Sequence, residues 1–298
     1  MQPISIPRTK KLVMGTLELL SELGERVFAG KWIAGPRIED AIARGKRFNA
    51  LGMSAIINYM GEDLRDEKEV ADAVATNLRL ITSIKKNRLK ASVSLKITQL
   101  GLRISKELAK RNYDRLVSFA RKNKVFVWLD AESHDTIDDA IWAYEGQVRR
   151  GGVGIAVQSY LKRSEGNVLR LLRHRAVIRL VKGAYKEDGS IAYRTGKERT
   201  QNYAVIMRQL FKRAQEFTIA THDQVLIDEA MRLNQVGKRK LTLAMLNGIR
   251  NRYAARLVAE GYKVAIYVPF GTRWIEFSLR RMNEASHIIL VLRSLLGG

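Results

Sequence analysis

The sequence predicts a (β/α)8 barrel, and three observations lead to this fold. Eight short apolar runs rich in β-branched residues occur between residues 54 and 268. Each run is followed by a longer stretch with helical periodicity. The runs are continuous rather than alternating, which is typical of parallel strands covered on both faces. Eight strand and helix units meet the count of a TIM-like barrel, although an open doubly wound sheet stays as the alternative, because counting strands does not establish closure.

The composition favours one large core. The chain has 298 residues, of which 46% are hydrophobic, and no Pro- or Gly-rich linker divides it. We therefore expect a single barrel domain over residues 1–298, with a helical extension at 1–51 and the barrel itself at 52–298. Cysteine is absent, which excludes disulfides, thiolate nucleophiles and Cys-ligated metals.

The extension at its start reads as helical, with leucines near helical spacing from residue 9 and a second helix expected after Gly35 and Pro36, where Pro36 suits a first turn. The expected strands are 54–60, 91–98, 125–132, 153–160, 177–185, 218–223, 241–246 and 264–268. The expected helices are 67–86, 105–122, 135–149, 165–173, 197–216, 224–235, 250–260 and 272–296.

Polar residues collect where these strands end. In a parallel barrel the chemistry takes place at the carboxyl ends of the strands, so these side chains should meet at one mouth. They are Lys96, Asp130, Glu132, Gln158, Tyr160, Arg179, Lys182, Tyr185, Thr221, His222 and Tyr267. Any one of them alone fits an ordinary polar residue at the start of a loop, and it is their collection at one end that indicates a site.

Several reaction classes find no support in the motifs. The glycines at 152 and 154 precede a strand instead of following one, so they fail as a dinucleotide fingerprint, and no Walker A loop occurs. The four histidines lack metal-ligand spacing, so no metal site is expected. No Gly-x-Ser-x-Gly motif suggests a catalytic triad.

The formal net charge of +23 is unusual for a cytosolic enzyme and favours an anionic partner. Lys and Arg are spread along the chain, and no zinc-finger or RNP-like motif accompanies them. Nucleic-acid binding is therefore not expected as the main function, whereas peripheral contact with an anionic membrane fits the charge.

Two adjacent arginines, Arg280 and Arg281, occupy the last predicted helix. Neighbouring helical residues point about 100° apart, so both reach one anion only above a concave site. Guanidinium groups bind carboxylates in a bidentate way, and the pair suits a small carboxylate clamp. The alternative is a solvated basic face.

The basic mouth suits a phosphate-bearing cofactor. Arg179 and Lys182 lie on one strand, and Gly183 opens the backbone beside them. Such cations fit a pyrophosphate and the electron-rich edge of a flavin ring.

At this point the motifs resemble one family. The segments are Ser-Leu-Lys96-Ile-Thr-Gln-Leu-Gly, Trp-Leu-Asp130-Ala-Glu-Ser, Val-Gln158-Ser-Tyr, Ile-Arg179-Leu-Val-Lys182-Gly-Ala-Tyr185, Ala-Thr221-His222-Asp, Tyr267-Val-Pro-Phe-Gly and Arg280-Arg281-Met-Asn-Glu284. Together they resemble, in order and position, the FAD-dependent proline dehydrogenases of the monofunctional type.

The resemblance implies a distorted barrel that holds FAD and oxidises L-proline to Δ1-pyrroline-5-carboxylate by hydride transfer to flavin N5, the first step of proline catabolism. It implies catalytic roles for Asp130, in the charge network of the site, and for Arg179, beside flavin N5. The implied substrate contacts are Lys96, Tyr185, Leu246, Tyr267, Arg280 and Arg281. The implied FAD contacts are Ala131, Gln158, Arg179, Lys182, Gly183, Ala184, Thr221 and His222, with Glu284 orienting the arginine pair.

The expected partners are L-proline, a quinone or other electron acceptor, an anionic membrane surface and a second copy of the chain. No signal peptide or apolar run of membrane-spanning length is apparent, so a cytoplasmic location with peripheral membrane contact is expected. Two alternatives stay open. One is a flavoenzyme of the same fold acting on another cyclic or N-alkyl amino acid, and the other is a basic nucleic-acid- or membrane-binding barrel without activity.

Overall fold

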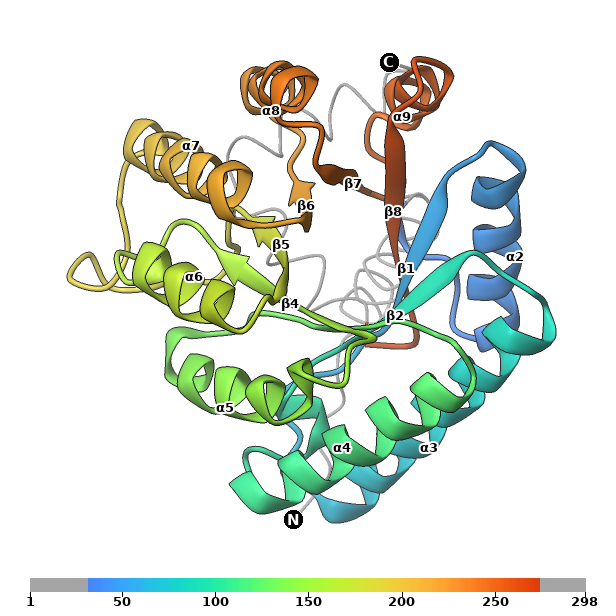
Figure 1. Cartoon of the computed structure of the whole chain (residues 1–298). Coiled ribbons are helices and arrows are strands. Elements are labelled where there is room, and N and C mark those ends of the chain that lie inside the picture. The colour runs from blue at the N-terminus through green and yellow to red at the C-terminus, as the bar shows by residue number, and fades with distance from the viewer. Residues whose placement is uncertain (1–31, 274–298) are drawn as a thin grey trace, which may run out of the picture.

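A computed structural model describes residues 32–273 and shows eight parallel strands closed into a barrel (Figure 1). Each strand pairs with the next along the chain, and β8 also pairs with β1, from Ser54 opposite Ala265 to Tyr59 opposite Phe270. This closure confirms the barrel and rules out the open sheet. The strands are β1 (Ser54–Tyr59), β2 (Ala91–Leu95), β3 (Val127–Leu129), β4 (Val153–Gln158), β5 (Val177–Val181), β6 (Glu216–Ala220), β7 (Lys240–Leu246) and β8 (Lys263–Phe270).

Helices alternate with these strands and surround the barrel, close to the predicted ranges (Figure 1). Side-chain caps fix the starts of α3, α4, α7 and α8; for example, Asp66 accepts a hydrogen bond from the backbone N–H of Glu69 at the start of α3. The helices are α2 (Ile38–Ala50), α3 (Glu67–Lys86), α4 (Lys106–Lys122), α5 (Ile137–Val148), α6 (Ser164–Arg173), α7 (Gly196–Arg213), α8 (Gln224–Gly237) and α9 (Asn251–Ala259), with short 3-10 turns at Thr98–Leu100 and His134–Thr136.

Helix α2 precedes the barrel in sequence and packs against both β1 and β8. Two backbone bonds attach its leading segment to β8: the N–H of Ala34 donates to Pro269, and the N–H of Gly271 donates to Gly35. The expected place of Pro36 in the first turn was wrong. The helix begins at Ile38, because Arg37 is the N-cap residue and donates its backbone N–H to the Asp40 carboxylate.

The two faces of the strands differ in chemistry, because successive side chains in a strand point to opposite sides. Outward residues such as Ile178 and Leu180 pack in the main apolar core against the helices. Inward residues include Arg179 and Tyr267, which line a pocket inside the barrel. The outer layer therefore supplies the hydrophobic burial, and the inner layer is available for polar groups.

Six strands end earlier than predicted, β1 by a single residue. They end at Tyr59, Leu95, Leu129, Gln158, Val181 and Ala220. After β5 the chain turns at Gly183, which has φ of +111°, a region that an extended strand does not use. Lys96, Asp130, Lys182 and Tyr185 therefore follow their strands rather than end them, because the predicted strands included the mostly polar residues that begin the loops.

The expected helical pattern at 9–31 and the expected helix at 272–296 lie outside the described residues, apart from Thr272 and Arg273. Among residues 32–273, no helix combines the length and apolar composition that a bilayer-spanning segment requires.

Candidate active site

One pocket opens at the carboxyl ends of the strands and is lined by every described residue for which the family resemblance implied a role. Its predicted members are Lys96, Asp130, Ala131, Gln158, Arg179, Lys182, Gly183, Ala184, Tyr185, Thr221, His222, Leu246 and Tyr267, and apolar members such as Ile56 and Met245 complete it. Glu132 and Tyr160, which were expected at the same mouth, do not line it: Glu132 accepts hydrogen bonds from Thr98, and the Tyr160 ring is buried behind Gly183. Arg280, Arg281 and Glu284 lie outside the described residues.

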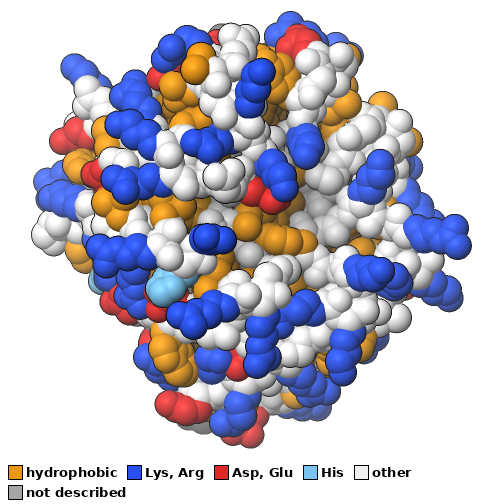
Figure 2. Space-filling model, viewed as in Figure 1, with side chains coloured by type: hydrophobic (Ala, Val, Ile, Leu, Met, Phe, Trp, Pro, Cys, Tyr) orange, Lys and Arg blue, Asp and Glu red, His pale blue; other side chains and the backbone are white. Residues whose placement is uncertain are grey.

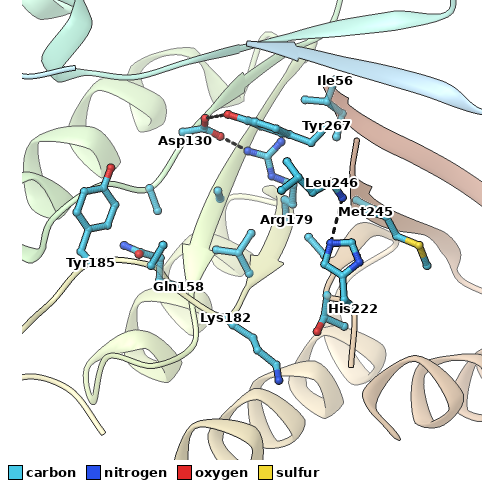
Figure 3. Close-up of a pocket in the computed structure, with 18 of the residues that line it drawn as sticks. Ile56, Asp130, Gln158, Arg179, Lys182, Tyr185, His222, Met245, Leu246 and Tyr267 are labelled. Carbon is cyan, nitrogen blue, oxygen red and sulfur yellow. Dashed lines mark hydrogen bonds and ion pairs between the residues drawn. The ribbon is translucent and has the colours of Figure 1, made fainter. Parts of the chain in front are cut away.

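The centre of the pocket is a buried ion pair between Asp130, after β3, and Arg179 of β5 (Figure 3). The same carboxylate accepts hydrogen bonds from Ser94 Oγ at 2.7 Å and from the Tyr267 hydroxyl at 2.7 Å. The Arg179 guanidinium also lies over the rings of Trp128 and Tyr267, 4.9 and 5.5 Å from their centroids. Three strands other than β5 thus hold Arg179 in one orientation.

The charges of Asp130 and Arg179 compensate each other within the pocket. Burial alone would raise the pKa of Asp130, but Arg179 and Lys96 outweigh burial and hold that pKa below its ordinary value. Burial, followed by the Asp130 charge, raises the pKa of Tyr267 well above its usual range, so the phenol stays protonated and donates. The Arg179 Nη1 atom is buried and has no hydrogen-bond partner among residues 32–273. One donor of this fixed guanidinium, in a side chain that lines the pocket, therefore has no acceptor among the described residues.

A second ionic group lies beside the first. Lys96 Nζ is 2.9 Å from the Glu62 carboxylate and donates to the Tyr185 hydroxyl at 3.2 Å. Tyr185 in turn donates to Glu62 at 3.0 Å. Burial opposes the ammonium charge, but Tyr185, Glu62 and further carboxylates raise the pKa of Lys96 well above its usual value. Lys96 is therefore a permanent cation at the rim of the pocket.

The segment after β5 forms the glycine-opened side of the pocket. A Cβ atom at Gly183 would lie 2.1 Å from the ring of Tyr160, so only glycine fits between that ring and the pocket. Lys182 reaches away from the Asp130 cluster (Figure 3) and pairs with Asp223 at 2.7 Å. Asp223 is the N-cap of α8, and its carboxylate accepts a hydrogen bond from the backbone N–H of Val225. The lysine is thus anchored at a helix start, a position that suits anions.

The opposite side is built by β6 and β7. His222 Nε2 accepts a hydrogen bond from the backbone N–H of Leu246 at 3.2 Å (Figure 3). In a neutral imidazole the proton then sits on Nδ1. Arg250 donates to the backbone carbonyl of His222 at 2.7 Å. This bond fixes the loop after β6 that carries His222. Leu246 and Met245 give this side an apolar surface.

Three contributors to the site were missed in the sequence. Glu62 follows β1, so the rule that selected the other strand-end residues applied to it as well. Ser94 lies two residues before Lys96, and Trp128 two residues before Asp130, which places each on the same inward side as its neighbour. Period-two alternation within β2 and β3 would have found both.

Among residues 32–273 no group of three or more His, Cys, Asp or Glu side chains is arranged to hold a metal ion. What the site offers is a pocket with an apolar side, fixed cations and a close backbone approach. Pockets of this kind, mostly apolar with a few oriented polar groups, bind small molecules and cofactors.

Together with the carboxyl-end location in a (β/α)8 barrel, this defines the class of the protein, a barrel enzyme with its site at the mouth. The family model described as proline dehydrogenase matches residues 41–288. The chain belongs to the proline dehydrogenase family, whose members are flavin-dependent oxidoreductases that oxidise proline in proline catabolism.

Named relatives agree over most of the chain. Proline dehydrogenase 1 of Bacillus subtilis (strain 168) is 30% identical over 278 residues, covering 92% of this chain and 92% of the relative. Proline dehydrogenase of Deinococcus radiodurans is 31% identical over 265 residues, covering 86% of each.

The fold has solved counterparts. The crystal structure of proline utilization A (PutA) from Bdellovibrio bacteriovorus, inactivated by N-propargylglycine, matches with a TM-score of 0.82 at 21% identity. The match covers 89% of this chain but only 34% of the PutA chain, so this protein corresponds to about a third of that protein's length. At this identity the likeness establishes the barrel fold alone.

Proposed function

We propose that this protein is an FAD-dependent proline dehydrogenase that converts L-proline to Δ1-pyrroline-5-carboxylate. The observation that carries the proposal is Arg179, a buried guanidinium fixed by Asp130 with one donor, Nη1, still available in the pocket. Cofactor-bearing barrels need such a donor at the reactive edge of the ring, where it stabilises developing charge.

The residues present fit FAD. Lys182, near the start of α8, and the backbone around Gly183 and Ala184 suit the pyrophosphate, because cations and close backbone approach favour phosphate oxygens. Thr221, His222, Gln158 and Ala131 line the same pocket and would hold the remainder of the cofactor. Bound FAD supplies the hydride acceptor, its N5 atom.

The proline carboxylate is an anion, so its part of the site must supply cations. Lys96 is held as a cation and would contribute to binding the proline carboxylate together with Arg280 and Arg281, which Glu284 would orient from the same helix. Leu246, Tyr185 and Tyr267 would pack against the pyrrolidine ring. Holding the carboxylate at one end places the carbon next to the ring nitrogen in a fixed position, so these cations act by orientation.

The protonation states of Asp130 and Tyr267 are consistent with a role in holding Arg179 in place. Hydride departure requires a neutral amine, since its lone pair forms the new C=N bond. Asp130 is held ionised by Arg179, and Tyr267 is held protonated, so neither changes charge near neutral pH. Both act by fixing Arg179, and neither is suited to take up the proton that the substrate amine loses before hydride transfer.

Further partners follow from the family resemblance and the charge. We propose a cytoplasmic enzyme whose flavin is reoxidised by a quinone or another electron acceptor. Peripheral contact with anionic lipid and self-association are part of the proposal, and the +23 charge supports the first of these.

The test is the visible spectrum of the purified protein. Flavin bands should be present and should bleach anaerobically on addition of L-proline, but much less on addition of L-pipecolate or sarcosine at equal concentration. A colourless protein would contradict the cofactor assignment, and preferential bleaching by another amine would contradict the substrate.

Substitution then tests the proposed carboxylate clamp. Arg280→Gln and Arg281→Gln should each raise KM for proline by roughly tenfold or more, the effect expected for a lost charge-assisted bond, and keep the yellow colour. Arg170→Gln is the matched control, because this exposed arginine lies on the outer helix α6 and pairs with Glu145 of α5.

A further inference from the structure

Arg250, between β7 and α9, stands in a backbone conformation and at a helix position that do not suit arginine. Lys and Arg side chains cover much of the surface, as one face of the molecule shows (Figure 2), so a positive charge alone marks no site. Arg250, however, has φ of +54°, in the left-handed region that favours glycine. It is also the N-cap of α9, and helix amino termini disfavour cations. Residues held in such unfavourable conformations cluster at functional sites, which directs attention to what this side chain contacts.

The half-buried side chain of Arg250 donates two hydrogen bonds to the loop after β6 and the start of α8. Its Nη1 donates to the backbone carbonyl of His222 at 2.7 Å, and its Nη2 donates to the side-chain carbonyl of Gln224, the first residue of α8. The guanidinium carbon lies 4.1 Å from the centroid of the Tyr253 ring, whose hydroxyl accepts a bond from Gln224 at 2.7 Å. Two acceptors and one ring therefore fix the orientation of the guanidinium.

Neutralisation of charge does not explain this arginine. Both of its hydrogen-bond acceptors are uncharged, and Arg250 forms no ion pair with another residue in the described part of the chain. A planar fork with several donors in fixed directions is the feature that separates arginine from lysine. The geometry uses that feature, because one side chain reaches the His222 backbone and the Gln224 side chain together.

A second hydrogen bond runs between the same two loops in the opposite direction. The backbone N–H of Leu246, the last residue of β7, donates to Nε2 of His222 at 3.2 Å (Figure 3). The ring of His222 is thus bonded to the end of β7, and its backbone carbonyl is bonded to Arg250. Because one bond holds the ring and the other holds the backbone, both the position and the orientation of His222 are fixed.

Both ends of this link line the pocket. His222 lies on the side that the proposed function assigns to FAD, and Leu246 lies on the side assigned to proline. The loop that carries Arg250 is joined to β8 as well, because the backbone N–H of Asn247 donates to the carbonyl of Tyr267 at 2.9 Å. Arg250 itself is not among the residues that line the pocket. Any effect on a bound molecule must therefore pass through the residues that it holds.

We propose that Arg250 is a positioning residue that holds His222 against the cofactor and keeps the loops after β6 and β7 at a fixed separation. This inference rests on the proposed function, in which His222 contacts FAD. The unfavourable backbone conformation at position 250 is retained because the side chain reaches His222 from that place. Loss of the side chain should weaken FAD binding far more than it weakens the fold.

The test variant is Arg250→Gly, and Lys238→Gly is its matched control. Lys238 follows α8 with φ of +46° and is exposed, so glycine there changes a left-handed position without removing a contact to the pocket. Both variants should melt within a few degrees of the wild type, because glycine suits these turns. Arg250→Gly should raise the dissociation constant of FAD, measured by the quenching of its fluorescence, by roughly tenfold or more, the effect of losing a charge-assisted hydrogen bond. Equal FAD affinities in the two variants would overturn the proposal.

Hydrogen exchange supplies a readout that a purely structural role would not give. In Arg250→Gly with saturating FAD, the amide of Leu246 should exchange roughly tenfold faster, since its acceptor His222 is no longer held. The amide of Tyr160, bonded to the Lys182 carbonyl at 3.0 Å across the pocket, should exchange as in the wild type. Faster exchange at both amides together with a large fall in melting temperature would make Arg250 a structural residue only and would overturn the proposal.

Rescue completes the test. Millimolar guanidinium should restore FAD affinity to Arg250→Gly, whereas sodium chloride at the same concentration should not. If Arg250→Gly does not fold, Arg250→Lys replaces it, because lysine keeps the charge but not the planar fork. An unchanged FAD affinity in Arg250→Lys would then contradict the proposal. Wild-type protein that binds no flavin would contradict the proposed function instead, and the exchange of the Leu246 amide without FAD would still show whether Arg250 holds the loop.

Discussion

Replacing Asp130 by Asn tests the buried ion pair at the centre of the pocket. The change removes the counter-charge of Arg179, which is only 3% exposed, and leaves the guanidinium buried without compensation. Breaking one partner of a buried pair costs about 3–5 kcal/mol. A domain with a free energy of unfolding of about 5–15 kcal/mol should therefore still fold, but with a much lower denaturation midpoint.

Urea unfolding of both proteins at neutral pH measures this loss. The control is Glu145→Gln, which breaks the exposed pair with Arg170 and should cost no more than about 1 kcal/mol. Because the pKa of Asp130 is lowered in the folded state, its contribution is present above the ordinary carboxyl pKa and disappears as pH falls through the folded value. The difference between wild type and Asp130→Asn should therefore shrink in acid. A loss equal to that of the control, or one that grows in acid, would refute the reasoning.

Two further predictions concern the pocket and a third concerns the loop after β5. Gly183→Ala puts a Cβ against the Tyr160 ring and should lower the ratio of flavin to protein absorbance, and an unchanged ratio would contradict the close packing. Lys96→Met should raise KM for proline by roughly tenfold or more, with little change in bound flavin, whereas an unchanged KM would remove Lys96 from the substrate side. Glu187→Gln weakens the contact of that carboxylate with His134 at 2.7 Å and should speed proteolysis of the loop after β5; equal cleavage rates would show that the contact does not hold the loop.

The sequence predicted the barrel because buried parallel strands leave a strong apolar signal, and the carboxyl-end rule located Lys96, Asp130 and Arg179 correctly in one pocket. Their partners were harder to predict. Glu62 and Lys96 are far apart in sequence, and spacing carries no information about contacts made across a closed barrel. Such pairs meet only when the barrel closes.

Strand ends were also overestimated, for a local reason. The predicted fifth strand included Lys182 to Tyr185, although the composition already changes at Lys182, directly after the strand ends at Val181. A further signal of this end is Gly183, whose conformation ends the strand. The proposed arginine clamp at 280–281 lies outside the described residues and stays a prediction.

The separation of inward from outward side chains along each strand has an evolutionary consequence. Ala244 lines the pocket, whereas the preceding residue, Leu243, packs in the main apolar core, so a new side chain at position 244 reshapes the ligand cavity without replacing a side chain of that core. Substrate preference can thus diverge in this lineage through single substitutions that leave the scaffold intact, whereas a one-residue deletion within a strand would exchange the two layers and abolish both folding and activity.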